Sequence, residues 1–212
     1  MSRYNLLDRV VWPKQTSIIE PDDPEILSKR NVYKEGNGSS GSFLSEKMNR
    51  TVEYESHLEW DIYNIIEQSD EVKFYQEQPF EIPYFLKNKE YAYYPDVLII
   101  LNDGRGIVVE IKPLSDMVLF INIKKYNSMI KFCTEKGFGY LMTDKKNCYT
   151  DIDNFKTDPL FENAILNKVT NKPILWEEYQ LLKKKYNAKT EDFVSLILKN
   201  GLTWSLPFKI SL

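Results

Sequence analysis

The sequence contains one histidine, His57, and two cysteines, Cys133 and Cys148, among 212 residues. Structural zinc sites, zinc proteases, paired-histidine nucleases and His/Cys deaminases all need more of these ligands, so these classes are excluded. Two cysteines also provide no disulfide framework of the kind found in small secreted domains. Any metal bound by this chain is therefore expected to have oxygen ligands.

Long apolar runs are also absent. No run approaches the roughly 18 residues that a membrane span requires. At the start of the chain, Arg3, Asp8 and Arg9 interrupt the apolar residues, which does not fit a signal peptide. With 42% hydrophobic and 28% charged residues, the composition is typical of a globular protein with one principal core. We expect a cytoplasmic protein without membrane contact.

An excess of positive charge is the third absence, because 28 Lys and Arg stand against 31 Asp and Glu, for a net charge of -3. This balance argues against a strongly basic nucleic-acid binder, whose affinity comes mainly from cations that neutralise phosphates. A nuclease is not excluded. A catalytic carboxylate cluster lowers the net charge while nearby lysines still face the DNA backbone.

Proline and glycine gather in the first fifty residues. Pro13, Pro21 and Pro24 precede a Gly/Ser-rich segment at residues 36–42, which we expect to hold neither helix nor strand. This segment lacks the preceding strand and the Gly-Lys-Ser/Thr ending of a phosphate-binding loop. We interpret residues 1–50 as an N-terminal arm and a flexible Gly/Ser loop.

Residues 51–150 have the pattern of an α/β core. Apolar residues at three- and four-residue spacing predict a helix over residues 54–68. Runs of branched and aromatic residues predict strands, and Asp103-Gly104 between two such runs predicts a hairpin. Gly137 is a plausible C-cap for a second helix. The order of elements predicts a mixed β-sheet flanked by helices, with strands at residues 72–75, 80–85, 97–101, 107–111 and 138–143 and the second helix at 122–136.

Residues 151–212 predict a small helical C-terminal extension with helices near 162–169, 176–186 and 190–199. The last two helices could form a DNA-binding helix-turn-helix. The final helix contains Phe193, Val194, Leu196, Ile197 and Leu198, which is too apolar for an exposed recognition helix. Packing is therefore the favoured use of these helices.

The hairpin predicts where three charged residues lie. A tight turn centred on Asp103-Gly104 places Asp96 opposite Glu110 or its neighbour, at the Cβ separation of about 5 Å typical of facing residues. Side chains alternate along a strand, so Glu110 and Lys112 project from one face. The sequence therefore predicts that Asp96, Glu110 and Lys112 converge.

Two facing carboxylates repel each other, and a divalent cation removes that repulsion. Mg²⁺ takes oxygen ligands, usually one or two carboxylates with waters and phosphate oxygens, and we expect Mn²⁺ to substitute. The adjacent Lys112 could orient or deprotonate a water beside a phosphate. An isolated Glu-x-Lys is more often an exposed charge pair, and only the surrounding pattern favours a site.

Four motifs together resemble the TnsA family. They are Tyr54-Glu55-Ser56-His57-Leu58-Glu59, Gln76-Glu77-Gln78-Pro79, Tyr94-Pro95-Asp96 and Val109-Glu110-Ile111-Lys112. The resemblance covers about residues 50–143 and implies a restriction-endonuclease-like domain of the PD-(D/E)xK type. It further implies a metal-dependent DNA endonuclease that acts in transposition or in mobile-element or phage DNA processing.

The resemblance also implies residue roles. Asp96 and Glu110 match the metal-binding pair, Lys112 the catalytic lysine and Glu59 the helix carboxylate, which is a further catalytic and metal candidate. Gln78 matches a strand residue that borders the site. A helical wheel instead places Glu55 nearer the apolar stripe, so the choice between Glu55 and Glu59 stays open.

Contacts outside the acidic site are less specific. Lys124 and Lys125 are the best candidates for DNA phosphate contacts, although paired lysines are usually solvated. Tyr91, Tyr93 and Tyr94 could stack on bases, but aromatic strand residues more often pack.

Two other functions stay open beside the endonuclease. One is a catalytically silent DNA-binding or assembly subunit of a phage or transposon complex, and the other is a structural phage or interaction protein. TnsA proteins carry a larger partner-binding domain after the nuclease domain, and this chain has only about sixty residues there. A transposase, ATPase or other protein could nevertheless bind its C-terminal helices.

Overall fold

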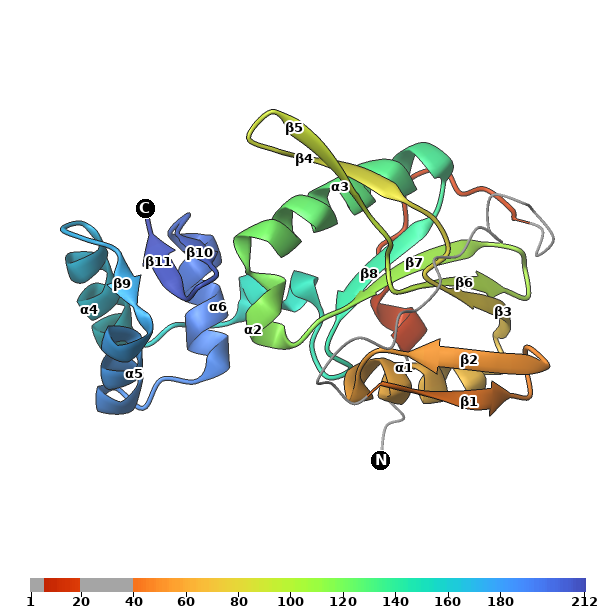
Figure 1. Ribbon diagram of the computed structural model, residues 1–212, viewed down its shortest axis with the longest axis horizontal. Helices are drawn as coiled ribbons and strands as arrows, with labels where there is room; N and C mark the ends of the chain where they lie inside the picture. The colour runs from red at the N-terminus through yellow and green to blue at the C-terminus, as the bar shows by residue number, and fades with distance from the viewer. Residues whose placement is uncertain (1–5, 20–39) are drawn as a thin grey trace. The chain divides into compact units, whose positions relative to one another are not determined.

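The computed structural model describes residues 6–19 and 40–212, which divide into two compact units (Figure 1). The first unit comprises Met1–Lys112 and Lys125–Lys146, and the second comprises Pro113–Lys124 and Asn147–Leu212. Within the described residues, no helix has the length and apolar character needed to cross a membrane.

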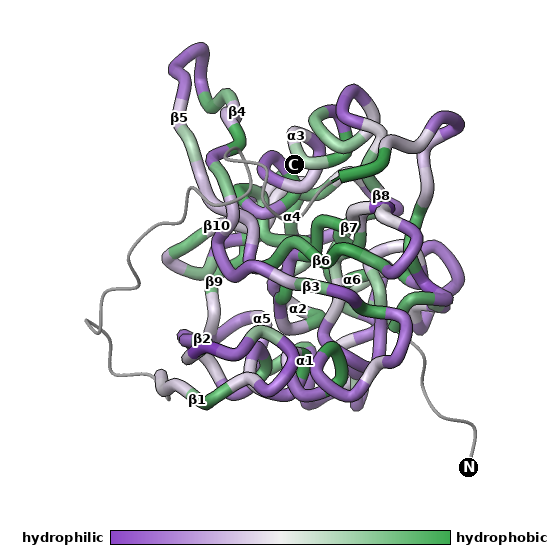
Figure 2. The backbone as a smooth tube through the Cα atoms, turned by 90° about the vertical axis from the view of Figure 1, so that its right-hand side faces the viewer, coloured by the Kyte–Doolittle hydropathy of each residue, from purple (hydrophilic) through white to green (hydrophobic). Residues whose placement is uncertain are grey.

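A four-stranded mixed sheet forms the centre of the first unit. The strand order is β3 (Val72–Glu77), β6 (Val97–Leu101), β7 (Gly106–Ile111), β8 (Gly139–Thr143). β7 pairs antiparallel with β6 and parallel with β8. In both views α1 (His57–Glu67) and α3 (Phe120–Lys136) lie on opposite sides of this sheet (Figures 1 and 2). The predicted restriction-endonuclease-like arrangement, a mixed sheet flanked by helices, is confirmed.

The central hairpin forms as its sequence predicts. Val97 pairs with Val109 and Ile100 with Gly106, in one of the two predicted registers. Gly104 has a φ of 84°, which an L side chain adopts only with strain. Every residue of β6 and β7 is buried, because helices cover both faces of the sheet.

The first helix begins later than predicted. Tyr54 ends β2 (Arg50–Tyr54), and Ser56 is the N-cap of α1, accepting a hydrogen bond from the backbone N–H of Glu59 at 3.1 Å. A serine hydroxyl satisfies one of the unpaired N–H groups of the first turn. The helix therefore starts at His57, and the expectation that it includes Tyr54 and Glu55 is wrong.

The expectation that the whole Gly/Ser segment is a loop is also wrong at its end. Gly41 and Ser42 belong to β1 (Gly41–Ser45), which pairs antiparallel with β2, Gly41 lying opposite Tyr54. A Cβ at Gly41 would lie 2.4 Å from the Tyr54 hydroxyl oxygen. Glycine permits this close approach to the tyrosine ring. Pro21, Pro24 and residues 36–39 lie outside the described residues.

The described part of the N-terminal arm packs on the central sheet. It contains a short 3-10 helix, η1 (Leu6–Arg9). Val11 exchanges two backbone hydrogen bonds with Tyr140 of β8, each 3.0 Å long. The guanidinium of Arg105 lies 4.4 Å from the centre of the Trp12 ring. The pairing of Val11 extends the sheet at its edge strand β8.

A separate hairpin consists of β4 (Ile82–Leu86) and β5 (Lys89–Tyr93), which pair only with each other in the described part of the chain. Pro83 lies inside β4. A strand in a two-stranded sheet has a free edge, so the missing N–H of proline is tolerated there.

The helix predicted at residues 122–136 is confirmed by α3, and the strand predicted at residues 138–143 is confirmed by β8. Gly137 has a φ of 76° at the end of α3.

The second unit contains the three predicted C-terminal helices and further elements. The helices are α4 (Pro159–Val169), α5 (Trp176–Lys185) and α6 (Thr190–Lys199). The sequence did not predict three short strands, whose sheet order is β10-β11-β9, so the unit is not purely helical. The added elements are α2 (Leu114–Met117), η2 (Tyr149–Asn154), β9 (Ile174–Leu175), β10 (Thr203–Ser205) and β11 (Lys209–Ser211).

Helix α6 forms part of the core of this second unit. Phe193, Val194, Leu196 and Ile197 are all buried. A recognition helix must expose the face that reads DNA. The sequence-based preference for packing over a helix-turn-helix is therefore confirmed.

Candidate active site

Three charged side chains meet at one end of the β6–β7 hairpin. Asp96 directly precedes β6, Glu110 is the penultimate residue of β7, and Lys112 follows β7. The Lys112 Nζ lies 3.1 Å from the Asp96 Oδ2 and 2.9 Å from the Glu110 Oε1. The convergence predicted from the hairpin register is present.

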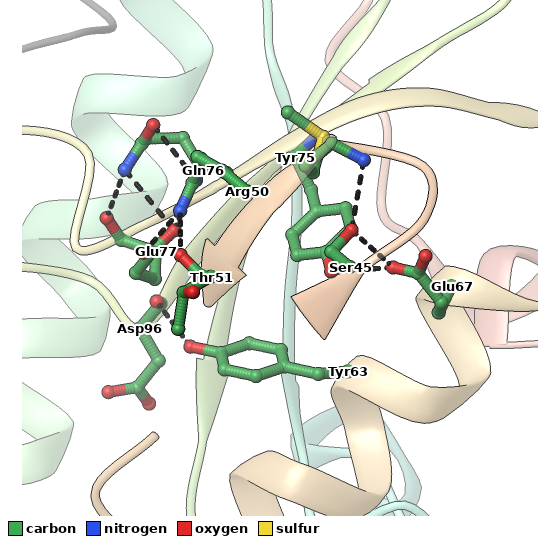
Figure 3. A network of polar contacts seen from close by, with 10 residues as sticks. Ser45, Arg50, Thr51, Tyr63, Glu67, Tyr75, Gln76, Glu77 and Asp96 are labelled. Carbon is green, nitrogen blue, oxygen red and sulfur yellow. Dashed lines mark hydrogen bonds and ion pairs between the residues drawn. The ribbon is translucent and has the colours of Figure 1, made fainter. Parts of the chain in front are cut away.

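Asp96 is fixed by both its side chain and its backbone. Its Oδ2 accepts a 2.5 Å hydrogen bond from the Ile111 N–H. Its carbonyl accepts a hydrogen bond from the Gln78 N–H at 3.0 Å. It accepts a second from the Tyr63 hydroxyl at 3.2 Å (Figure 3). Groups from β3, α1 and β7 thus hold Asp96 in one orientation.

Glu110 is a buried carboxylate that is only half satisfied. Its exposed fraction is 3%, and its Oε2 has no hydrogen-bond partner among the described residues. Burial, and then the negative charge of Asp96, raise the pKa of Glu110 to about 7 although Lys112 acts in the opposite direction. Burial of Lys112 lowers its pKa, but Asp96 and Glu110 outweigh this effect and raise the pKa above the ordinary value. Lys112 is therefore an ammonium group at neutral pH.

Glu59 is the carboxyl group of α1 whose pKa is affected by the charge of Asp96. Burial and the charge of Asp96 raise the pKa of Glu59 to about 7. Its carboxylate accepts a 2.8 Å hydrogen bond from the Glu55 N–H and lies 3.1 Å from the Ser56 hydroxyl. Glu55 is exposed and precedes the helix. The helical wheel that favoured Glu55 fails because Glu55 lies outside α1.

Gln78 borders the site at the end of β3. It has a φ of 43° and an exposed fraction of 8%, and its Oε1 has no hydrogen-bond partner among the described residues. Leaving a buried amide oxygen unpaired costs roughly 1–3 kcal/mol. An unpaired oxygen of this kind is consistent with a ligand or water that completes the site.

The two candidate phosphate-binding lysines have different surroundings. Lys124 is exposed and belongs to the second compact unit. Lys125 is half-buried, and its Nζ lies 5.9 Å from the Tyr84 ring centre and 5.3 Å from the Tyr93 ring centre. Burial lowers the pKa of Lys125, whereas the charge of Glu110 acts to raise it. Lys125 is therefore within electrostatic range of the acidic pair.

The acidic pair fits a hard divalent cation in its chemistry. Asp96 and Glu110 supply two carboxylates, and the unpaired Oε2 of Glu110 can accept a cation in place of a hydrogen bond. Over residues 6–19 and 40–212, no three residues among His, Cys, Asp and Glu gather as a metal site. Glu59 is the further carboxylate that the sequence offers as a ligand, and the remaining ligands would be other oxygens, such as those of water or phosphate.

Sequence reasoning missed a buried ion pair beside the site. Glu77 is 1% exposed, and both its carboxylate oxygens bind the Arg50 guanidinium, at 2.6 and 2.5 Å (Figure 3). Arg50 also donates a 3.2 Å hydrogen bond to the side chain of Gln76. The contact joins β2 to the end of β3, next to Gln78. The available signal for this ion pair was Glu77 itself, an acid between two glutamines in a buried strand. A buried charge needs a partner.

A comparison with family sequence models identifies a match over residues 69–144 to the family described as TnsA-like endonuclease N terminal. The matched segment contains Gln78, Asp96, Glu110 and Lys112, and it begins after Glu59. The resemblance found in the sequence motifs is confirmed over this segment. A search of curated proteins finds no significant match.

Proposed function

We propose that this chain, which carries a TnsA-like endonuclease segment, hydrolyses phosphodiester bonds in DNA with Mg²⁺ as cofactor. The family match supports a nuclease related to transposition, with DNA as the substrate. The observation that carries the finer proposal is the convergence of Asp96, Glu110 and Lys112 inside the matched segment. Two acids and a lysine at adjacent strand ends suit metal-assisted hydrolysis.

In this proposal Asp96 and Glu110 hold the cation, and Mn²⁺ substitutes for Mg²⁺. A cation held there supplies Lewis acidity to a phosphoryl oxygen and to a water molecule. Asp96 is oriented by hydrogen bonds from Ile111, Gln78 and Tyr63. The ligand geometry is therefore largely set by the fold, which lowers the ordering cost of binding.

Lys112 has a role separate from metal binding. Its ammonium bridges the carboxylates of Asp96 and Glu110. With a cation held by Asp96 and Glu110, the Lys112 ammonium would donate hydrogen bonds to the scissile phosphate or to a water beside it. Its raised pKa favours this donor role over removal of a proton from water, because the neutral amine is scarce at neutral pH.

The remaining candidates take supporting roles in the proposal. Glu59, whose pKa burial and the charge of Asp96 raise to about 7, is proposed as a further metal-binding and catalytic carboxylate. Lys125 and Lys124 are proposed to contact DNA phosphates. Lys125 has the stronger support, because its charge interacts with Glu110 and Asp96.

A second candidate function is a catalytically silent DNA-binding or assembly subunit of a phage or transposon complex. The observation that favours it is that Lys112 already bridges both carboxylates, as in a structural ion triad. A structural triad needs no metal. Absence of divalent-metal binding together with normal folding would favour this candidate over the nuclease.

The proposal includes delivery to DNA by another protein, such as a transposase or an ATPase. A net charge of -3 provides little general affinity for DNA. The second unit exposes apolar side chains around a cavity of about 740 Å³ lined by Leu175, Trp176, Leu206 and Phe208 among others. Efficient site-specific cleavage by the isolated chain at physiological salt would contradict this dependence on a partner.

The direct test is a cleavage assay on supercoiled, linear and branched DNA with Mg²⁺ or Mn²⁺. Wild type should cut at least one substrate only when metal is present, and Glu110→Gln should not cut. The control is Asp103→Asn, which removes an exposed carboxylate at the turn of the same hairpin and should cut normally. Equal activity of all three proteins, with or without metal, would refute the proposed function.

A further inference from the structure

The hairpin β4–β5 is a structured ribbon that the proposed chemistry does not use. Five residue pairs join its strands, from Ile82–Tyr93 to Leu86–Lys89. The turn residues Lys87 and Asn88 both have positive φ, 48° and 61°, the combination of a type I′ turn that matches strand twist. Figure 2 shows the hairpin extending from the body of its unit, with hydrophilic residues at the tip.

One face of this ribbon is aromatic. Tyr84 lies opposite Tyr91, with their ring centres 5.6 Å apart, and the Tyr93 ring meets Tyr84 edge-on at 5.9 Å. Tyr84 and Tyr93 are buried, whereas Tyr91 is 39% exposed and Lys89 is exposed over the Tyr91 ring at 5.4 Å. The face thus runs from a root, the packed end with Tyr84 and Tyr93, to an accessible tip with Tyr91 and Lys89.

The root of this face packs against Lys125 of α3. The Tyr93 hydroxyl donates a 3.0 Å hydrogen bond to the Lys125 carbonyl, and the Lys125 ammonium lies over the rings of Tyr84 and Tyr93. Burial, and then the charge of Glu110, raise the pKa of Tyr93. The aromatic face therefore begins at Lys125 of α3 and ends at Lys89.

The two faces of the hairpin differ in charge. Lys89 and Lys125 flank the tyrosines at the two ends of one face. The opposite face exposes Glu90, paired with Phe85, which is 63% exposed. A face with cations at both ends is complementary to the phosphates of a duplex. The partly exposed ring between them can make apolar contact with base edges in a groove.

We propose that this face of hairpin β4–β5, with Lys89 at the tip and Lys125 at the root, is a surface that holds the duplex DNA substrate. The inference rests on the proposed nuclease function and names the element that positions its substrate. Five residues of strand span about 17 Å, and a two-stranded ribbon fits the major groove, which is about 12 Å wide. Lys89 then contacts a backbone phosphate several nucleotides from the phosphate nearest Lys125.

The test measures binding without cleavage. A short non-specific duplex with a fluorescent label is titrated with full-length protein in EDTA, and anisotropy gives the affinity at several salt concentrations. Lys89→Ala should weaken binding and reduce the slope of log affinity against log salt by about 0.9, the value for one lost phosphate contact. The ratio of wild-type to variant affinity should consequently shrink about threefold between about 50 and 200 mM salt.

Two further variants complete the design. Tyr91→Leu keeps an apolar contact with Tyr84 but removes the exposed ring, and it should weaken binding without changing the salt slope. Lys131→Ala is the matched lysine control, because Lys131 is 78% exposed on α3 and pairs with Glu135; it should bind as wild type does. Thermal unfolding verifies that each variant is folded.

The outcomes separate this inference from the proposed function. Wild-type affinity and salt slope in both Lys89→Ala and Tyr91→Leu would overturn the hairpin assignment, whatever the cleavage assay shows. A wild-type protein that neither binds Mn²⁺ nor cuts DNA would overturn the nuclease, yet a hairpin-dependent salt slope would still identify the DNA-binding face. Equal losses in Lys89→Ala and Lys131→Ala would also overturn the assignment, since they indicate only general charge attraction.

Discussion

Lys112 and a divalent cation compete for the same oxygens at the residue scale. The ammonium lies within 3.1 Å of one oxygen of Asp96 and 2.9 Å of one oxygen of Glu110. Calorimetry with Mn²⁺ should show that Asp96→Ala and Glu110→Ala lose binding, because each removes a ligand. Lys112→Ala should retain binding but lose cleavage by about 10²- to 10⁴-fold, the usual effect of removing a positioned proton donor. Equal Mn²⁺ binding by the wild type, Asp96→Ala and Glu110→Ala, or normal cleavage by Lys112→Ala, would refute these roles.

The raised pKa of Glu110, about 7, makes metal binding sensitive to pH. A cation must displace the proton that the carboxylate carries below this pH. Mn²⁺ affinity should therefore rise between about pH 6 and 8 and release a proton at the lower end. Calorimetry in two buffers with different ionisation enthalpies measures the released protons. A pH-independent affinity without proton release would show that Glu110 is already ionised when the metal binds.

The same shift has a consequence for stability without metal. The folded state binds the Glu110 proton more tightly than the unfolded state, so the stability contributed by this group is full below about pH 4.5 and falls as pH rises towards 7. Glu110→Gln removes the ionisable group. The free energy of unfolding of Glu110→Gln minus that of wild type should increase by roughly 1–3 kcal/mol between pH 5 and pH 8 in EDTA. Denaturant titrations at both pH values test this; an unchanged difference would indicate an ordinary pKa.

At the scale of elements, the central hairpin was predictable because all of its signals are local. The Asp-Gly turn and the two apolar runs determine both pairing and register, and these place Asp96 opposite Glu110. The choice between Glu55 and Glu59 depended on where α1 begins. That boundary depends on pairing of Tyr54 with Gly41, which no local pattern indicates. Strands β9, β10 and β11, of two or three residues, are too short to leave a periodic signal.

The start of α1 links local structure to the site. Ser56 caps the helix and its hydroxyl also lies 3.1 Å from the Glu59 carboxylate. Ser56→Ala should cost about 1 kcal/mol of stability, as for other N-caps, and should also reduce cleavage, because Glu59 loses one orienting contact. Asp158→Ala removes the N-cap of α4 in the second unit and should lower stability without this loss of activity. Equal activity of the two variants would show that the orientation of Glu59 does not matter.

For the whole molecule, the second unit requires its last two helices. Phe161 of α4 packs against Tyr179 and Tyr186, with ring centres 6.5 and 6.3 Å apart, and Phe193 packs 5.1 Å from Tyr179. A chain that ends at Lys172 loses all of these partners and leaves the buried face of α4 uncovered. Exposure of a buried aromatic side chain alone costs about 3 kcal/mol or more. We therefore expect the truncated second unit to be unfolded.

Tryptophan fluorescence can distinguish the two units in this experiment. Trp12 and Trp60 lie in the first unit, whereas Trp176 and Trp204 lie in the second. Truncation at Lys172 removes the latter pair, so the remaining fluorescence reports on the first unit, while circular dichroism reports on both. We expect lost helix beyond that of the deleted residues, because α4 unfolds as well. Retention of α4 helicity with an unchanged melting temperature would show that the last forty residues are dispensable for folding. Their exposed apolar side chains would then be assigned to binding of a partner.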